Sequence, residues 1–133
     1  MFLGVGAAAH AAESAALSFQ RANKSSVELF RDASKKKYRK YWLEVIQEYS
    51  GICEKHPDSP FAPNARYKAA KLYRELYGYS GSTADLRKAS ETFQQVARDY
   101  PWSSLADDSL YNAGRIEERL GNKEQAQKLY RRV

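Results

Sequence analysis

The stretch Trp42–Leu76, WLEVIQEYSGICEKHPDSPFAPNARYKAAKLYREL, aligns without a gap onto Leu86–Leu120, LRKASETFQQVARDYPWSSLADDSLYNAGRIEERL. The offset is 44 residues, as the distance from Pro57 to Pro101 shows. A period of this length, carried by helical patterns, is typical of stacked helix pairs in which each unit buries its apolar face against its neighbours. The identical pairs in this register are Pro57/Pro101, Ser59/Ser103, Ala62/Ala106, Tyr67/Tyr111, Ala69/Ala113 and Leu76/Leu120.

From Glu13 onward, apolar residues recur at spacings of three and four, and no segment alternates as a strand would. Proline, glycine and serine interrupt this pattern where helices would end. The sequence therefore predicts an all-α fold, an α–α solenoid of about six antiparallel helices. The predicted helices are Ser14–Arg31, Lys36–Lys55, one from Phe61 to the loop Gly78–Gly81, one from Ser82 to Tyr100, one from Ser103 or Ser104 to Leu120, and one after Asn122.

Local signals refine the ends and faces of these helices. Ser34 is the expected N-cap of the second helix, and Tyr38 is the first residue of its apolar face. Ser82 with Asp85 three residues later resembles a capping box in which Asp replaces the usual Glu. The first helix carries a loose apolar stripe of Ala16, Phe19, Ala22, Val27 and Phe30.

The 133 residues are enough for one domain, and 43% of them are hydrophobic. Lys and Arg total 22 against 16 Asp and Glu, so the net charge is +6, which indicates anionic partners or a solvated basic surface. Cys53 is the only cysteine, which excludes an internal disulfide and a thiol metal cluster. Because Ala97 stands at its repeat position, we expect Cys53 to be a buried core thiol.

The first twelve residues carry no acidic or basic side chain apart from His10, and Ala9-His10-Ala11 has the small-x-small form of a signal-peptidase site. We interpret residues 1–12 as the remnant of a signal peptide, with an alanine-rich helix extension as the alternative. The segment is too short to span a membrane. Residues 13–133 are then the helical repeat domain, with units at about 36–76, 82–120 and an incomplete one at 122–133.

The last unit resembles the tetratricopeptide repeat at its small and aromatic packing positions. These are Leu110–Gly114, Leu120–Asn122, Ala126, Tyr130 and Val133. In that family, the residues that match Gly114 and Ala126 let the two helices of a repeat approach closely, and the residue that matches Tyr130 fills the gap to the next repeat. The preceding unit has Ala70 where Gly114 stands and a longer loop, and so resembles a divergent member.

A narrower resemblance is to secreted bacterial envelope proteins, and within them to the helical-repeat region ahead of some N-acetylmuramoyl-L-alanine amidases. The stretches that carry it are Lys37–Leu43, His56–Pro60, Lys71–Tyr77 and Tyr100–Asp108. It implies a periplasmic or secreted protein whose repeats precede a targeting domain and a zinc amidase domain. The alternatives are a freestanding periplasmic adaptor of outer-membrane assembly or Tol–Pal type, and an RNA-binding helical array.

Catalytic motifs are absent from the sequence. The two histidines, His10 and His56, are too few for a zinc site of the usual kind, and no phosphate-binding loop or Ser-His-Asp set is present. The acidic pairs Asp107-Asp108 and Glu117-Glu118 point in different directions on a helix, so we expect solvated charges. The sequence predicts a protein that is not an enzyme and that holds no metal or cofactor.

Binding is expected on the concave side of the solenoid, which the first helix of each pair lines in tetratricopeptide arrays. Tyr67 and Tyr111 share a repeat position there, and Lys71 and Arg115 follow one turn later. This pattern favours a groove for an extended envelope peptide or protein. The alternative is that both tyrosines are packing residues. No nucleic acid is expected as a partner. The candidate residues are Asn64, Tyr67, Lys71, Arg74, Asp108, Tyr111, Arg115 and Glu118.

A second candidate surface is a run of five bases in six residues. Such a run suits phosphates or anionic lipid. On a continuous helix its side chains would spread around the circumference, so a solvated helix start is the alternative. The basic patch consists of Lys35, Lys36, Lys37, Arg39 and Lys40.

Overall fold

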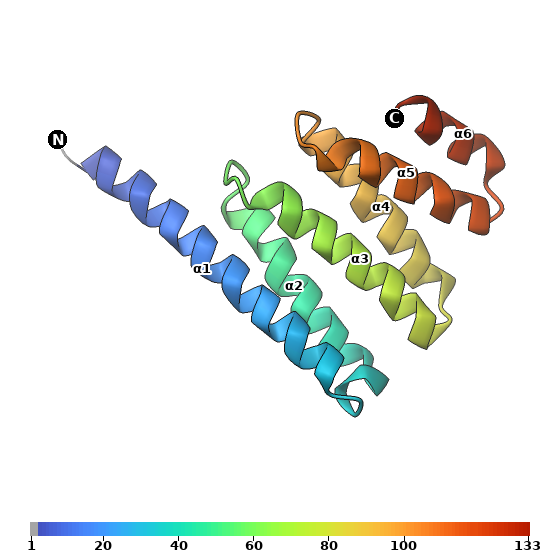
Figure 1. Cartoon of the computed structure of the whole chain (residues 1–133), viewed down its shortest axis with the longest axis horizontal. Helices are drawn as coiled ribbons and strands as arrows, with labels where there is room; N and C mark the ends of the chain where they lie inside the picture. The colour runs from blue at the N-terminus through green and yellow to red at the C-terminus, as the bar shows by residue number, and fades with distance from the viewer. Residues whose placement is uncertain (1–2) are drawn as a thin grey trace. The chain divides into compact units, whose positions relative to one another are not determined.

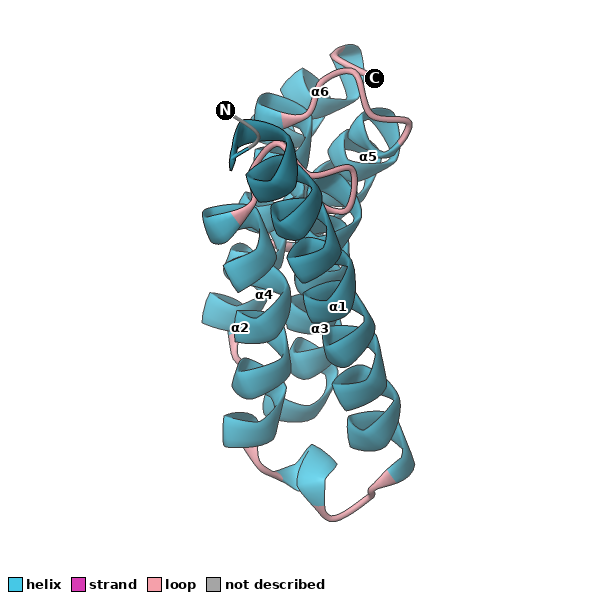
Figure 2. Cartoon of the chain, turned by 90° about the vertical axis from the view of Figure 1, so that its left-hand side faces the viewer, coloured by secondary structure: helices cyan, strands magenta, loops and turns pink. Residues whose placement is uncertain are grey.

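The computed structural model describes the backbone of residues 3–133 and the side chains from residue 14 onward. Within these residues the chain forms six α-helices and one short 3₁₀ helix, with no strand (Figures 1 and 2). The all-α prediction is confirmed. The elements are α1 (Leu3–Arg31), η1 (Lys35–Lys37), α2 (Arg39–Lys55), α3 (Ala62–Ser80), α4 (Thr83–Asp99), α5 (Leu105–Arg119) and α6 (Lys123–Arg131).

The chain divides into two compact units, Met1–Ala65 and Arg66–Val133. In the first unit α1 packs against α2, and the two helices run antiparallel (Figure 1). In the second unit α4 packs against α5, and α5 packs against α6. Each unit is therefore held together by neighbouring antiparallel helices, as the sequence pattern predicted.

The 44-residue repeat is reproduced in the two turns that contain its proline. His56 donates its N–H to Ile52 O at 2.8 Å, and Tyr100 donates to Val96 O at 2.9 Å. The dihedral angles of these two residues are φ −134°, ψ 59° and φ −131°, ψ 57°. Ser59 Oγ then accepts the N–H two residues on at 3.1 Å, and so does Ser103 Oγ. The same residues thus form the same turn in each unit.

The core of the first unit differs from the predicted stripe on α1. Ala15, Ala22 and Leu29 are buried, whereas Val27 and Phe30 are more than one third exposed. The buried residues recur every seven positions, which is the seam of two helices that cross at a small angle. Phe19 continues this seam against Tyr49 of α2, with ring centroids 6.1 Å apart. Phe19 and Ala22 of the predicted stripe lie on this seam, whereas Ala15 and Leu29 were missed and Val27 and Phe30 were assigned to it wrongly.

The start of the second helix was also predicted wrongly. Residues 35–37 form η1, and Tyr38 adopts an extended conformation (φ −115°, ψ 118°) before α2 begins at Arg39. Tyr38 is 60% exposed and is not part of the buried face. Ser34 makes no side-chain capping hydrogen bond. Cys53 is buried as expected, and its Sγ lies 3.2 Å from Ala62 O.

The core of the second unit follows the predicted helix faces. Phe93 is fully buried at its centre, and its ring meets Tyr67 edge-on at 5.4 Å between centroids. Gly114 lies against Tyr130, because a Cβ built on Gly114 would stand 2.4 Å from Tyr130 Cε1. The close approach of α5 and α6 that the resemblance implies is therefore present. The buried cluster comprises Ala70, Leu86, Ala89, Phe93, Ala97, Ala106, Leu110, Ala113, Ile116 and Leu129.

Two features of the α3–α4 connection correct the sequence analysis. α3 continues through Gly78 to Ser80, and Gly81 ends it with φ +65°. No capping box forms at Ser82, since the Asp85 carboxylate instead accepts a hydrogen bond from Ser80 Oγ at 2.7 Å. The predicted loop is thus reduced to two residues between the helices.

The predicted signal-peptide remnant lies largely beyond what the structure describes. Its first two residues are outside the described backbone, and its side chains are outside the described ones. The backbone of α1 is helical from Leu3, eleven residues earlier than predicted, and both interpretations of this segment allow a helix. The boundary at residue 12 stays a prediction. None of the described helices combines the length and the apolar character that crossing a membrane requires.

Candidate functional site

The main candidate site lies in the second unit, on neighbouring faces of α3 and α5. Seven of the eight predicted concave-face residues are in this unit, and Asn64 belongs to the first one. We call the seven together the α3–α5 face. Its members are Tyr67, Lys71, Arg74, Asp108, Tyr111, Arg115 and Glu118.

Hydrogen bonds join the two helices at one end of this face. The Tyr67 hydroxyl donates a hydrogen bond to Asp108 Oδ2, and Asn112 Nδ2 lies 3.4 Å from the same hydroxyl. Arg74 Nη1 donates to Asn112 Oδ1 at 2.8 Å. Burial and the neighbouring Asp108 carboxylate raise the pKa of Tyr67 above its usual value. These contacts fix the spacing between α3 and α5.

The two repeat-related pairs have a common geometry. Lys71 Nζ stands 5.7 Å from the centre of the Tyr67 ring, and the Arg115 guanidinium stands 5.9 Å from the centre of the Tyr111 ring. Both distances are within the range of a cation–π contact. Each base therefore lies over the tyrosine one turn before it, as the repeat register suggested.

The tyrosines themselves are not equivalent. The Tyr67 ring packs on Phe93 and its hydroxyl is bound to α5, so it contributes to the core. Tyr111 is 47% exposed, and its hydroxyl accepts a hydrogen bond from Arg115 at 3.2 Å. The packing alternative thus describes Tyr67, while Tyr111 presents an aromatic ring to solvent. A binding role for the face stays a prediction.

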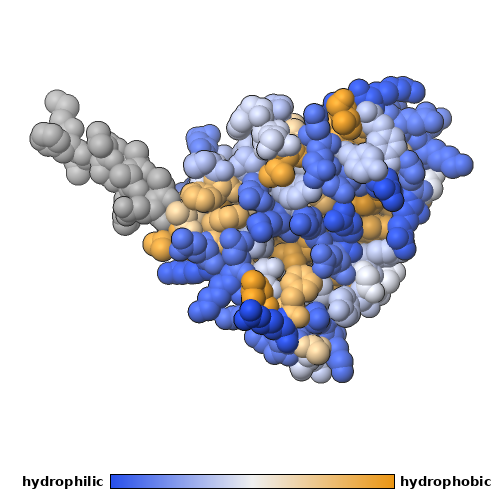
Figure 3. Space-filling view, viewed as in Figure 1, coloured by the Kyte–Doolittle hydropathy of each residue, from blue (hydrophilic) through white to orange (hydrophobic). Residues whose placement is uncertain are grey.

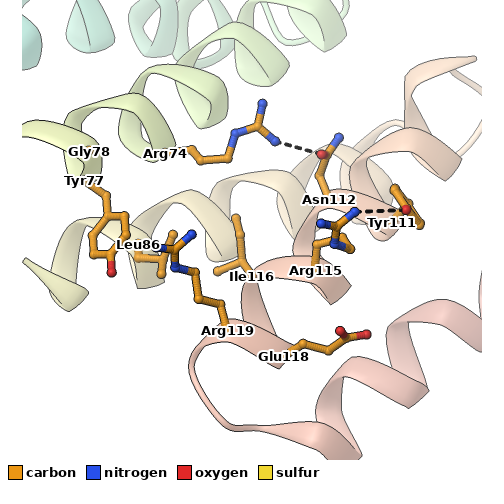
Figure 4. A pocket seen from close by; sticks show the side chains of 10 residues that line it. All are labelled: Arg74, Tyr77, Gly78, Leu86, Tyr111, Asn112, Arg115, Ile116, Glu118 and Arg119. Carbon is orange, nitrogen blue, oxygen red and sulfur yellow. Dashed lines mark hydrogen bonds between the residues drawn. The ribbon is translucent and has the colours of Figure 1, made fainter. Parts of the chain in front are cut away.

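A cavity of about 650 Å³ opens beside these residues, between α3, α4 and α5. Figure 4 shows Arg74 reaching it from α3 and Arg115 and Arg119 reaching it from α5. The Arg119 guanidinium lies 5.2 Å from the centre of the Tyr77 ring. Glu118 is the only acidic residue in the lining. The cavity therefore combines a cationic rim with the apolar floor of Leu86 and Ile116.

A second hollow of about 470 Å³ adjoins the first on the α6 side. Tyr111, Arg115 and Glu118 line both, so the two hollows form one continuous surface. Tyr130 of α6 closes it, with its ring centroid 5.9 Å from that of Tyr111. Burial and the Glu118 carboxylate raise the pKa of Tyr130 to about 12. The phenol therefore stays protonated at neutral pH as a hydrogen-bond donor.

Sequence reasoning missed three residues of this site: Tyr77, Asn112 and Arg119. Two of them had a usable signal, because Arg119 follows Arg115 by four residues and Tyr77 follows Arg74 by three, which places each pair on one helical face. Asn112 had no such signal, since its hydrogen bond with Arg74 depends on how α3 packs against α5. A helical face can be predicted from one helix alone, whereas the hydrogen bonds between α3 and α5 can be predicted only when both helices are placed.

The predicted basic patch lies in the first unit, in η1 and at the start of α2. It contributes nothing to the cavity described above, whose lining residues all belong to the second unit.

The acidic pairs carry no metal site in the described residues, where no three His, Cys, Asp or Glu side chains lie close enough to hold an ion. Glu117 is buried, which corrects the expectation of a solvated charge. It accepts hydrogen bonds from Ser90 Oγ at 2.9 Å and from Asn122 Nδ2 at 2.8 Å. Glu117 thus connects α4, α5 and the turn before α6, which is a structural role.

Comparison with known families agrees with this architecture. The family model of the tetratricopeptide repeat matches residues 64–102 and 108–133. Over these residues the chain is similar to tetratricopeptide repeats, which agrees with its antiparallel helix pairs. No curated protein and no solved structure matches the chain. Tetratricopeptide repeats are helical scaffolds for protein–protein interaction, and their stacked helices offer extended concave surfaces to a partner.

Proposed function

We propose that the α3–α5 face and its cavity bind an extended peptide segment of a partner protein, with acidic side chains or a terminal carboxylate in contact with the arginines. The observation that carries this proposal is the cavity itself, which Arg74, Arg115 and Arg119 line against one glutamate. Guanidinium groups bind carboxylates through two parallel hydrogen bonds. A cationic, partly apolar hollow of this size suits a few residues of a peptide.

The arginines are held in place before any ligand arrives. Arg74 lies 5.5 Å from the centre of the Phe93 ring and is hydrogen-bonded to Asn112. Arg119 lies over Tyr77, and Arg115 over Tyr111. Side chains that are already ordered lose less conformational entropy on binding. The stacked arginines therefore favour specific recognition over a diffuse attraction of anions.

The setting that we propose is the bacterial cell envelope, where the chain would be the non-catalytic interaction module at the N-terminal side of a secreted N-acetylmuramoyl-L-alanine amidase. The resemblance of Lys37–Leu43, His56–Pro60 and Lys71–Tyr77 to such regions supports it. The partner is then an envelope protein or a cell-wall peptide. The coding sequence that follows Val133 tests the setting, because a zinc amidase domain there supports it and an unrelated enzyme domain contradicts it.

Fluorescence anisotropy with labelled peptides tests the binding site. We expect an extended peptide with alternating Glu and aromatic residues to bind, and a matched peptide with Lys in place of Glu to bind more weakly. Arg115 and Arg119 are both exposed and both line the cavity, so Arg115→Glu/Arg119→Glu should abolish the preference. Its thermal midpoint should stay near that of the parent, because exposed charges change stability by less than about 0.5 kcal/mol.

The matched control is Lys123→Glu/Lys128→Glu on α6, where both lysines are exposed and outside the two hollows. It changes the net charge equally and should keep the preference for the acidic peptide. Equal losses from the two double variants would show that net charge alone drives association, and the site assignment would then be wrong.

A further inference from the structure

The α1–α2 connection in the first unit carries a dense basic group that the proposed function does not use. We call it the basic tip, and it comprises Lys35, Lys36, Lys37, Tyr38, Arg39 and Lys40. η1 holds the three lysines, Tyr38 is extended, and Arg39 and Lys40 begin α2. The run is a turn rather than one continuous helix, and its backbone lies at the end of the α1–α2 hairpin (Figure 2).

The lysines of the tip form no ion pair within the described residues. Asp32 is the nearest acid in sequence, and its Oδ1 accepts the backbone N–H groups of Ser34 and Lys35 at 3.0 and 3.2 Å. No ion pair involves Lys36, Lys37 or Lys40 in residues 14–133. Asp32 therefore shapes the turn. The ammonium groups of Lys35 and Lys40 lie 5.5 and 5.7 Å from the centre of the Tyr41 ring, and Lys37 is exposed, so none of the three is held by a carboxylate.

The starts of α2 and α3 both lack the acidic residues that the starts of α4, α5 and α6 carry. The first turns of α4, α5 and α6 contain Asp85, Asp107 with Asp108, and Glu124, whereas the first turn of α2 contains no acid. Acids stabilise a helix start by about 0.3–1 kcal/mol each, and bases oppose the dipole there. Arg39 and Lys40 thus reduce the stability of α2, a cost that an anionic surface would offset.

Aromatic and apolar side chains accompany the bases. Tyr38 is 60% exposed and Phe30, at the end of α1, is 37% exposed. Figure 3 shows orange and blue atoms side by side at the lower end of the molecule, the region of the α1–α2 connection in Figure 1. Exposed aromatic rings among bases are typical of proteins that rest on a membrane interface.

We propose that the basic tip docks on the surface of an anionic lipid bilayer, with its lysines among the headgroup phosphates and the Tyr38 ring at the interface. Nucleic acid fits less well. The hollow beside the tip has only about 100 Å³, and Glu28, Glu44 and Glu48 line it together with Lys35, so it offers no cationic groove to a nucleic-acid strand. A protruding basic end suits a flat anionic surface better than a strand that needs a groove with stacking platforms.

Vesicle co-sedimentation tests this proposal with the full chain. We expect binding to vesicles of equal parts phosphatidylcholine and phosphatidylglycerol, and none to phosphatidylcholine alone. Lys36→Glu/Lys37→Glu/Lys40→Glu should weaken binding on the order of a hundredfold, since each base near such a surface contributes about 1 kcal/mol. The variant should fold at least as well as the parent, because the new acid at position 40 favours the start of α2.

The matched control is Lys123→Glu/Lys128→Glu/Arg131→Glu, which makes the same charge change on exposed positions of α6. It should lower binding no more than a few-fold. Tyr38→Ser should give a smaller loss than the triple reversal at the tip and leave the salt dependence unchanged. Equal losses from the two triple variants would overturn the proposal, and so would binding to a single-stranded oligonucleotide without binding to anionic vesicles.

Discussion

The turn between α2 and α3 and the turn between α4 and α5 share their hydrogen bonds, yet the helix pairs of their units are built in different ways. In the first unit α1 meets α2 along a seam of small and aliphatic residues every seven positions, Ala15, Ala22 and Leu29. In the second unit α5 meets α6 where Gly114 admits the Tyr130 ring. The turn is thus set by its own proline and serine, whereas each helix interface is set by the residues of its faces.

Overpacking should have the largest effect in both units. Ala22, Ala69 and Ala113 are fully buried, and Trp at any of them should lower the free energy of unfolding by more than about 2 kcal/mol, because far smaller insertions cost about 1–3 kcal/mol. Thermal denaturation measures this. An unchanged midpoint for Ala22→Trp would contradict the seven-residue seam, and one for Ala69→Trp or Ala113→Trp would contradict the 44-residue register.

Substitution of two helical glycines should have opposite effects on stability, because one lies against a neighbouring helix and the other does not. Gly114→Ala should destabilise the chain by about 1–3 kcal/mol, because its Cβ forces the Tyr130 ring away from α5. Gly51 of α2 has no atom within 4 Å of a built Cβ, so Gly51→Ala should instead add about 0.5–1 kcal/mol through helix propensity. Urea denaturation of both variants compares them. A stabilising Gly114→Ala would show that close approach is not what the glycine provides.

The shared turn predicts equal effects in the two units. Ser59→Ala and Ser103→Ala each remove a hydroxyl that accepts a backbone N–H at 3.1 Å, and each should cost about 1 kcal/mol. Amide hydrogen exchange at Phe61 and Leu105 reports the loss locally. Costs that differ several-fold between the two sites would mean that surroundings, and not the turn, determine its stability.

The last effect concerns stability at alkaline pH, and it is absent at neutral pH. Burial raises the pKa of Tyr49 to about 12, and burial with Glu118 raises that of Tyr130 to about 12. The unfolded chain, with tyrosine pKa values near 10, loses these protons first, so stability should fall as pH rises from about 10 to about 12. Tyr49→Phe and Tyr130→Phe should each flatten this decline in denaturation curves. An unchanged decline in both variants would contradict the assignment.

Much of the fold was predictable because the repeat register and the apolar periodicity are local properties of the sequence. The faces of α4 and α5 have strong contrast between residues such as Phe93 or Ile116 and their charged neighbours. The face of α1 has weaker contrast, since two of its three buried seam residues are Ala15 and Ala22. Gly78 was taken as a helix end, but it lies inside α3 with open space around it, and of these two glycines it is Gly81 that has positive φ.

The sequence predicted which residues share a helix face in the candidate site, but it did not predict the hydrogen bonds between the helices. Tyr67, Lys71, Tyr111 and Arg115 follow from the repeat, and their cation–π contacts connect residues four apart. Hydrogen bonds that connect residues 38 or more apart, such as those of Arg74 with Asn112 and of Tyr67 with Asp108, depend on how the helices pack. The spacing of residues along the sequence does not reveal which side chains of α3 and α5 lie opposite one another.

The matching turns at Pro57 and Pro101 also have a genetic consequence. Their backbone angles agree within a few degrees, so a recombination event between the two coding segments would join His56 to Pro101, or Tyr100 to Pro57, without altering the junction. Such an event removes or adds 44 residues, which is one complete pair of helices. The chain can therefore change length by whole repeats while every turn keeps its geometry, so that the heritable module is the helix pair rather than the single helix.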